Sequence, residues 1–295
     1  MKPISDEQME FFEDQGYLLV KGLLSPEEDL NPVIEEYGSV LDSLANELYL
    51  DGEITSTYEG FPFSERITKI YGESGGVHGQ YFDFSLPQGN IKKDTPFWCG
   101  PAVFRALTNP RLLDAVEAFI GPEIYSNPVQ HVRIKPPEAL TPVNPSTGRV
   151  LLGKTPWHQD NGYGHLSPAT AITTLTALDD ADIDNGCLWV LPGSHQAGQI
   201  DVTQRLSTKA KEAGLDLSVN VDRESDAIPV PLKAGDVVVL HCHLLHRSEG
   251  NLSSDRDRRI LFLRYADADA VEVYNDRRPR LGPLLRGATC FPEVA

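Results

Sequence analysis

Residues 234–251, AGDVVVLHCHLLHRSEGN, hold both a strand and a group of histidines. A Gly-Asp turn leads into an apolar, β-branched run that is typical of a buried strand. The run then delivers His241, His243 and His246 near its carboxyl end. This stretch therefore predicts a β core that gathers imidazole side chains at one point of the fold.

Similar runs surround this stretch. Short, β-branched and apolar segments occupy residues 129–137, 171–180, 187–195 and 258–268. Turns rich in Gly, Pro, Asn and Asp separate them, as is typical of strands in an antiparallel β core. We therefore expect the second half of the chain to form most of the β structure.

The first half of the chain carries helix signals instead. Ser5 is placed to cap a helix that ends at Gly16, and Pro26 stands at the first position of a second helix. Asn109 caps a third helix, which ends at Gly121. Helices first and strands later predict an α+β chain, mainly a β core, with the N-terminal helices packed outside.

The chain is expected to be one domain over residues 1–295, because no linker divides it. Residues 51–100 are rich in Gly, Ser and aromatic residues and are too long for an ordinary connection. We interpret them as an irregular insertion over the core that could serve as a lid.

The formal net charge of −17 disfavours binding to nucleic acid, to acidic membranes and to large polyanionic substrates. A small neutral or cationic substrate is favoured over an acyl-CoA. No apolar run is long enough to cross a membrane and no apolar signal core opens the chain, so a cytoplasmic location is expected. The four cysteines lack paired spacing, which argues against a disulfide framework and a zinc ribbon.

A second polar motif, WHQDNGYG at residues 157–164, supplies a histidine and a carboxylate two positions apart. In an extended chain His158 and Asp160 project to the same side, while Gln159 points away. A third ligand from the later histidines would complete the two-histidine, one-carboxylate set of non-haem Fe(II) oxygenases, which leaves coordination positions open. The same ligands also suit zinc, and a His-Asp pair taken alone is more typical of a polar turn or a surface hydrogen bond.

The residues after His246 suggest that this region also binds the carboxylate of a ligand. Arg258 lies at the start of a strand, and an arginine fork can hold a carboxylate through two hydrogen bonds. A bound 2-oxo acid needs such an anchor for its far carboxylate, and Ser248 can add a further bond. Arg259 is the alternative anchor, and a solvated basic turn is the alternative interpretation of both arginines.

Taken in order, these motifs resemble the phytanoyl-CoA dioxygenase family of Fe(II)- and 2-oxoglutarate-dependent oxygenases. The likeness covers most of the chain, from the opening SDEQMEFFEDQGYLLVKGLLSPEE through RIKPP, WHQDNGY and NGCLWVLPGSH to HRSEGN and RRILFLRY. It implies a double-stranded β-helix (jelly-roll, cupin-like) core. It also implies that His158, Asp160 and His246 bind the iron.

The resemblance further implies an arginine anchor for 2-oxoglutarate after the distal histidine. The segment NLSSDRDRR is one residue longer than the usual turn, and alignment of the strand start selects Arg258. Lys135, in RIKPP, matches a family lysine that can reach the cosubstrate. The context of His246 favours it over His241 and His243, which we interpret either as groups that support the ligands from behind or as buried polar residues.

The function implied is hydroxylation of a small molecule that consumes 2-oxoglutarate and O₂ and releases succinate and CO₂. Asp160 argues against halogenation, because related halogenases carry a small residue there. Desaturation, epoxidation and ring formation stay open. The alternatives from other classes are a cupin-like hydrolase or isomerase and a catalytically silent barrel. Asn161 and Tyr163 are the first candidates for substrate contacts.

Overall fold

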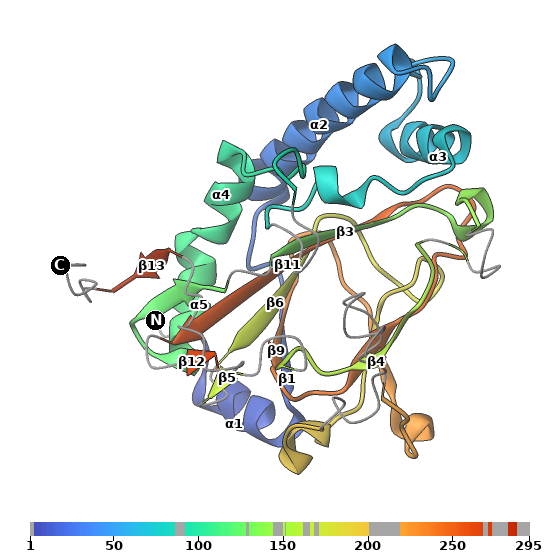
Figure 1. Ribbon diagram of the computed structural model, residues 1–295. Coiled ribbons are helices and arrows are strands. Elements are labelled where there is room, and N and C mark those ends of the chain that lie inside the picture. Colours follow the sequence, from blue (N-terminus) through green and yellow to red (C-terminus); the bar gives the residue numbers. More distant parts are fainter. Residues whose placement is uncertain are drawn as a thin grey trace.

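The computed structural model of the protein describes ten segments of the chain. They are residues 3–85, 92–127, 130–143, 150, 152–161, 166–167, 171–200, 219–267, 271–272 and 283–287. Within them, two antiparallel sheets face each other and helices cover the outside of the larger sheet (Figure 1). This arrangement confirms the predicted α+β architecture with a β core.

The strands form three sheets in which every described pair is antiparallel. The seven-stranded sheet has the order β1-β9-β6-β11-β2-β13, and β3 also pairs with β11. The four-stranded sheet has the order β4-β10-β7-β8, and β5 pairs with β12. The bounds are β1 (Tyr17–Val20), β2 (Ile124–Ser126), β3 (His131–Lys135), β4 (Thr155–His158), β5 (Leu166–Ser167), β6 (Ile172–Ala177), β7 (Leu188–Val190), β8 (Ile228–Val230), β9 (Val237–His241), β10 (His246–Ser248), β11 (Arg258–Asp267), β12 (Val271–Glu272) and β13 (Leu284–Arg286).

The helices begin and end largely where local signals place them. Ser5 and Asn109 accept backbone N–H groups at the starts of α1 and α5, and Gly16 ends α1 in the left-handed conformation. Pro26 opens a π-helical turn, η1 (Pro26–Leu30), that continues into α2. The other bounds are α1 (Asp6–Gln15), α2 (Asn31–Leu50), α3 (Phe63–Ser74), α4 (Pro101–Leu107) and α5 (Pro110–Ile120), with short 3₁₀ turns η2 (Gly79–Tyr81), η3 (Glu138–Leu140), η4 (Ser194–Ala197) and η5 (Glu224–Asp226).

The segment 51–100 is more regular than expected, because it contains α3. The helix buries Ile67, Ile70 and Tyr71, which recur at helical spacing on one face. This short amphipathic pattern was missed in the sequence because the surrounding residues are rich in Gly and Ser, which are typical of irregular segments. The proposals that this segment acts as a lid and that the chain is a single domain stay predictions.

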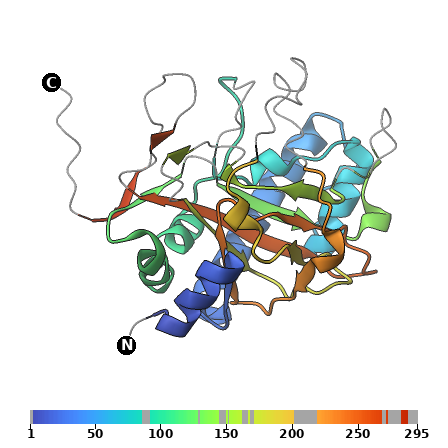
Figure 2. The same ribbon diagram turned by 90° about the horizontal axis from the view of Figure 1, so that it is seen from below.

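Alternation along the strands of the large sheet divides the apolar core into two layers. One face packs against the helices through Val237, Val239, Leu261 and Leu263. The opposite face packs against the small sheet through a separate set of apolar residues: Leu175, Ala177, Val238, Leu240 and Ile260 from the large sheet, and Leu188, Val190 and Val230 from the small one. Figure 2 shows β11 crossing the molecule with α1 and α5 on one side of it. The space between the two sheets is therefore the place where inward-facing polar residues meet.

Among the described residues, no helix combines the length and the apolar character needed to cross a membrane. A cytoplasmic location stays a prediction from the sequence. The described cysteines, Cys99, Cys187 and Cys242, are free thiols, and Cys290 lies outside the described residues.

Candidate metal centre

The small sheet brings the two histidines of the candidate centre together. His158 is the last residue of β4 and His246 is the first residue of β10, and the two are directly paired in the antiparallel register. Their rings lie 4.2 Å apart between centroids. The two histidines are 88 positions apart in the chain. They meet because the antiparallel pairing places the end of β4 opposite the start of β10.

Asp160 lies just beyond the end of β4, whereas the sequence suggested an extended chain through this residue. The side chain of Gln159 points away and is clamped: its amide nitrogen donates to the carbonyls of Gly198 (3.0 Å) and His243 (2.6 Å). Its amide oxygen accepts from the backbone N–H of Ile200 at 2.8 Å. This clamp holds the turn so that Asp160 faces the histidines although the strand has ended.

His158, Asp160 and His246 each offer one ligand atom, and these atoms all lie within 4.8 Å of one another. His246 Nε2 is 4.0 Å from Asp160 Oδ1. Donors bound to one ion at about 2.1 Å lie about 3–3.5 Å apart, so small side-chain movements would bring all three onto one metal. All three side chains are buried.

Hydrogen bonds orient both imidazoles for metal binding. His158 Nδ1 donates to the carbonyl of Pro156 at 2.9 Å, and His246 Nδ1 donates to that of Leu244 at 3.0 Å. A proton on Nδ1 leaves the lone pair on Nε2, the usual arrangement for a metal-binding histidine. Among the described residues, His246 Nε2 and Asp160 Oδ2 are buried without a hydrogen-bond partner. Buried polar atoms of this kind fit a site that holds a cation.

The charges at the centre suit a divalent ion. Burial, reinforced by the neighbouring His246, lowers the pKa of His158 to about 3, so its imidazole is neutral at physiological pH. Burial acts to raise the pKa of Asp160, but Arg264 and the two histidines outweigh it and hold that pKa below its usual range. His158 therefore offers a neutral imidazole and Asp160 a carboxylate, the forms that bind metal.

A second group of polar residues lies along the same strands. Arg258 on β11 is the direct register partner of Lys135 on β3, and both are buried. Lys135 Nζ donates to Ser248 Oγ and to the carbonyl of Glu249, both at 2.9 Å. Burial, with the nearby Arg258, lowers the pKa of Lys135 well below its usual value. The structure thus brings together the three residues that the sequence suggested for cosubstrate binding.

The two candidate arginines differ in their surroundings. Arg259 points to the other side of β11 and holds Asp179 through two hydrogen bonds of 2.7 and 2.6 Å. Arg258 is only 1% exposed, and among the described residues no carboxylate oxygen lies within 4.0 Å of it. Its Nε has no hydrogen-bond partner there. A buried guanidinium without an anion is costly, so this position fits a site for an anionic ligand.

Three other histidines, His195, His241 and His243, have contacts of their own. His195 Nε2 donates to the carbonyl of Glu13, which caps the end of α1, so the PGSH turn has a structural role. His241, Cys242 and His243 form a second group with ligand atoms within 4.8 Å. However, His241 Nδ1 accepts the backbone N–H of His243, and burial raises the pKa of the Cys242 thiol to about 12. That group is therefore less suited to bind a metal.

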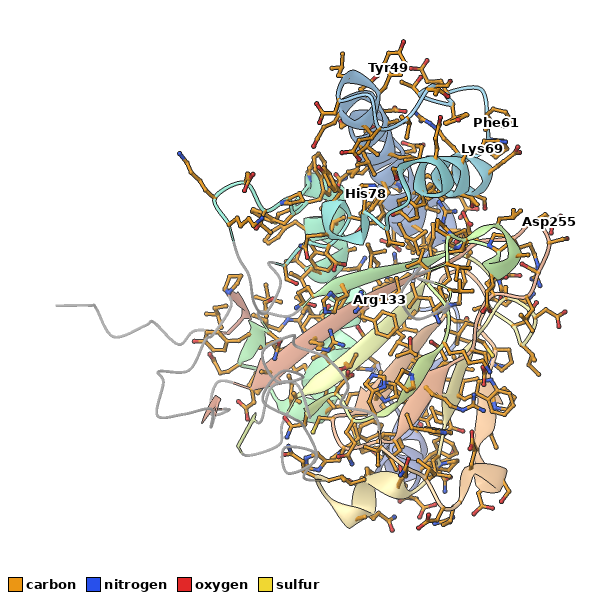
Figure 3. The ribbon with its side chains drawn as sticks, turned by 45° about the vertical axis from the view of Figure 1, so that its right-hand side comes forward. Tyr49, Phe61, Lys69, His78, Arg133 and Asp255 are labelled. Atoms are coloured by element: carbon orange, nitrogen blue, oxygen red, sulfur yellow. The ribbon has the colours of Figure 1, made fainter. Side chains whose placement is uncertain are left out.

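The expected substrate-side residues are partly described. The side chain of Asn161 is buried and donates to Gln199 Oε1 at 2.9 Å, while Tyr163 lies outside the described residues. Arg133, on the inward face of β3 with Lys135, is half exposed and lies 4.0 Å from Asp83 (Figure 3).

Arg264 is a residue of the site that no sequence motif singled out. Its Nη2 lies 3.0 Å from Asp160 Oδ1. Its place in the inward alternation Arg258, Ile260, Phe262, Arg264 was the signal that could have found it.

Comparison with known proteins gives a consistent result. The model of the family described as phytanoyl-CoA dioxygenase (PhyH) matches residues 12–260. Phytanoyl-CoA dioxygenase domain-containing protein 1 of Danio rerio is 26% identical over 275 residues, which cover 88% of this chain and 89% of that protein. The peroxisomal phytanoyl-CoA dioxygenase of Bos taurus is 26% identical over 273 residues, covering 90% of this chain and 69% of that protein.

Solved structures share the fold at lower identity. The apo structure of the non-heme monooxygenase ThoJ superposes with a TM-score of 0.60 at 21% identity, over 95% of this chain and 84% of that one. The α-ketoglutarate-dependent epimerase SnoN gives 0.55 at 20% identity, over 98% and 95% of the two chains. At these identities the likeness concerns the fold.

Proposed function

The chain belongs to the phytanoyl-CoA dioxygenase (PhyH) family of Fe(II)- and 2-oxoglutarate-dependent oxygenases, and from this premise we propose that it hydroxylates a C–H bond of a small molecule. The reaction would convert 2-oxoglutarate and O₂ into succinate and CO₂. The observation that carries the proposal is the buried convergence of His158, Asp160 and His246. Two imidazoles and one carboxylate leave positions open for cosubstrate and O₂.

The proposed roles of the chain's own residues follow from their positions. His158, Asp160 and His246 hold the iron, and the Nδ1 hydrogen bonds of the histidines keep Nε2 turned toward it. Iron together with 2-oxoglutarate and O₂ supplies the oxidising chemistry when bound. Burial of the three ligands keeps bulk water away from the reacting groups.

We assign Arg258, Ser248 and Lys135 to the far carboxylate of 2-oxoglutarate. Ser248 is two residues beyond His246 on β10, which places it about 6.6 Å further along the strand. That spacing suits a five-carbon dicarboxylate whose other end binds the metal. Arg258 supplies the charge, Ser248 can donate a hydrogen bond, and Lys135 already contacts Ser248. A non-oxidative cupin-like enzyme would not need this buried guanidinium. A catalytically silent barrel would need neither the guanidinium nor the metal ligands.

The substrate is proposed at the level of chemical class. The net charge of −17 favours a neutral or cationic small molecule over a polyanionic acyl-CoA. Hydroxylation is proposed because Asp160 occupies the position that halogenases leave open for chloride. Two proteins of similar fold are described as an epimerase and a carbocyclase, so the outcome of the reaction has to be measured on this protein.

The test is succinate formation from 2-oxoglutarate with Fe(II), O₂ and a panel of small molecules grouped by charge. We expect succinate and a product 16 mass units heavier than one panel member with the wild-type protein, and neither with His158→Ala. His78→Ala, which removes a histidine that bonds Ser74 instead, is the matched control. Equal succinate from wild type and His158→Ala would refute the proposal.

A further inference from the structure

Among the described residues, Arg264 is the charged group that lies closest to the candidate ligand carboxylate of Asp160. Its Nη2 donates to Asp160 Oδ1 over 3.0 Å, and its side chain is only 13% exposed. Asp160 Oδ2, in contrast, is buried without a hydrogen-bond partner among the described residues. The two oxygens of one carboxylate are thus in different surroundings, one bound by a guanidinium and the other not.

The backbone of Arg264 is held as firmly as its side chain. The amide of Gln130 pairs with it twice: Arg264 N donates to Gln130 Oε1 at 2.8 Å, and Gln130 Nε2 donates to the carbonyl of Arg264 at 2.8 Å. Gln130 is itself 3% exposed and also bonds Ser126 Oγ at 3.0 Å. Gln130 directly precedes β3, so the bonds from its side chain to the backbone of Arg264 continue the β3–β11 pairing. This network fixes the backbone position from which the Arg264 side chain extends to Asp160.

We propose that Arg264 is a positioning residue that restricts Asp160 to a single bond with the iron; this rests on the proposed function. A carboxylate can bind a metal through one oxygen or through both. With two imidazoles and a one-oxygen carboxylate, an octahedral ion keeps three positions, two for 2-oxoglutarate and one for O₂. A two-oxygen carboxylate would take the position that O₂ needs.

The guanidinium opposes two-oxygen binding for a geometric and an electrostatic reason. The guanidinium, whose backbone is fixed by Gln130, occupies Asp160 Oδ1 with its hydrogen bond and leaves Oδ2, which has no hydrogen-bond partner among the described residues, for the iron. The positive charge also draws electron density to Oδ1 and away from a second metal bond. Partners that hold a ligand in this way change metal affinity or activity about 10–100-fold when removed.

The test uses nitric oxide as a stand-in for O₂ and measures binding rather than turnover. Protein loaded anaerobically with Fe(II) and 2-oxoglutarate is titrated with nitric oxide, and the iron–nitrosyl complex is followed by electron paramagnetic resonance. We expect wild type to bind nitric oxide and Arg264→Met to bind it at least tenfold more weakly. Arg264→Lys, which keeps a cationic donor, should recover most of the affinity.

Arg259→Met is the matched control, since it removes an arginine from the same strand that binds Asp179 instead. It should bind nitric oxide like wild type. If Arg264→Met does not fold, Arg264→Gln, which is polar but shorter and uncharged, should show the same loss of nitric oxide affinity. Unchanged nitric oxide affinity in a folded Arg264→Met or Arg264→Gln variant would overturn the positioning role. Failure of the wild-type protein to bind Fe(II) and 2-oxoglutarate would instead overturn the proposed function.

Discussion

Replacement of Arg258 by methionine distinguishes the effect of this residue on folding stability from its effect on 2-oxoglutarate binding. The wild-type side chain is buried, has no carboxylate within 4.0 Å among the described residues, and has a pKa lowered by burial to about 10. In the protein without 2-oxoglutarate, the guanidinium is therefore a cost to stability. We expect Arg258→Met to unfold at no lower denaturant concentration than wild type when 2-oxoglutarate is absent.

With 2-oxoglutarate, the expected effect reverses. Removal of one partner of a buried charge pair costs about 3 kcal/mol at the lower end of the usual range, which applies here because, under the proposed assignment, Lys135 and Ser248 would still contact the carboxylate. At about 1.4 kcal/mol per factor of ten, this predicts a rise in Kd of about a hundredfold. At a ligand concentration of 100 times the wild-type Kd, 2-oxoglutarate would stabilise wild type by about 2.7 kcal/mol and the variant by about 0.4 kcal/mol.

The assay is anaerobic titration of the Fe(II)-loaded protein with 2-oxoglutarate, followed by calorimetry and by denaturant unfolding with and without the ligand. Arg259→Met is the control: it loses the bond to Asp179 and some stability, but should keep the wild-type affinity. An Arg258→Met protein whose Kd for 2-oxoglutarate stays within about threefold of wild type would refute the assignment of the anchor.

Three further changes test the surroundings of the site. Gln159→Leu should destabilise the protein by roughly 2–4 kcal/mol in denaturant unfolding, because three half-buried backbone partners lose their hydrogen bonds; a loss below about 1 kcal/mol would contradict the clamp. Gly186→Ala should cost at least about 2 kcal/mol, because φ is +82° and a Cβ would lie 2.5 Å from the carbonyl oxygen of Glu249; a wild-type melting temperature would argue against it. Burial raises the pKa of Asp257 to about 6, so its protonated form contributes stability that is present below about pH 4 and lost as the pH rises through about 6. Asp257→Asn should therefore gain about 2 kcal/mol over wild type at pH 8 and little at pH 4, and equal gains at both pH values would show that the carboxylate is not the cause.

Local patterns identified much of the architecture. The caps at Ser5 and Asn109 and the glycine after α1 depend on residues within one helical turn, so the sequence specifies them directly. The β-branched runs predicted β6, β9 and β11 because a strand buried on both faces is apolar throughout. Helix α3 was missed because its stripe is only three turns long and lies in a segment of unusual composition.

The candidate ligands could be named from the sequence because each lies in a short motif with its own spacing. The residues that surround them could not, because their partners come from distant strands. Arg258 and Arg259 are neighbours of the same residue type, and only the family resemblance favoured Arg258 in the sequence. Only the layers on the two sides of β11 decide that one meets Asp179 and the other lies buried beside Lys135.

The contact of Arg264 with Asp160 shows the same limit, since it joins residues 104 positions apart. The chemistry of the site, two imidazoles and a carboxylate, is determined by residue type and local spacing, which the sequence contains. Which cation faces which anion is determined by strand register and by the face that each strand turns inward. Those are properties of the packed sheets, because a shift of one residue would exchange every inward and outward side chain.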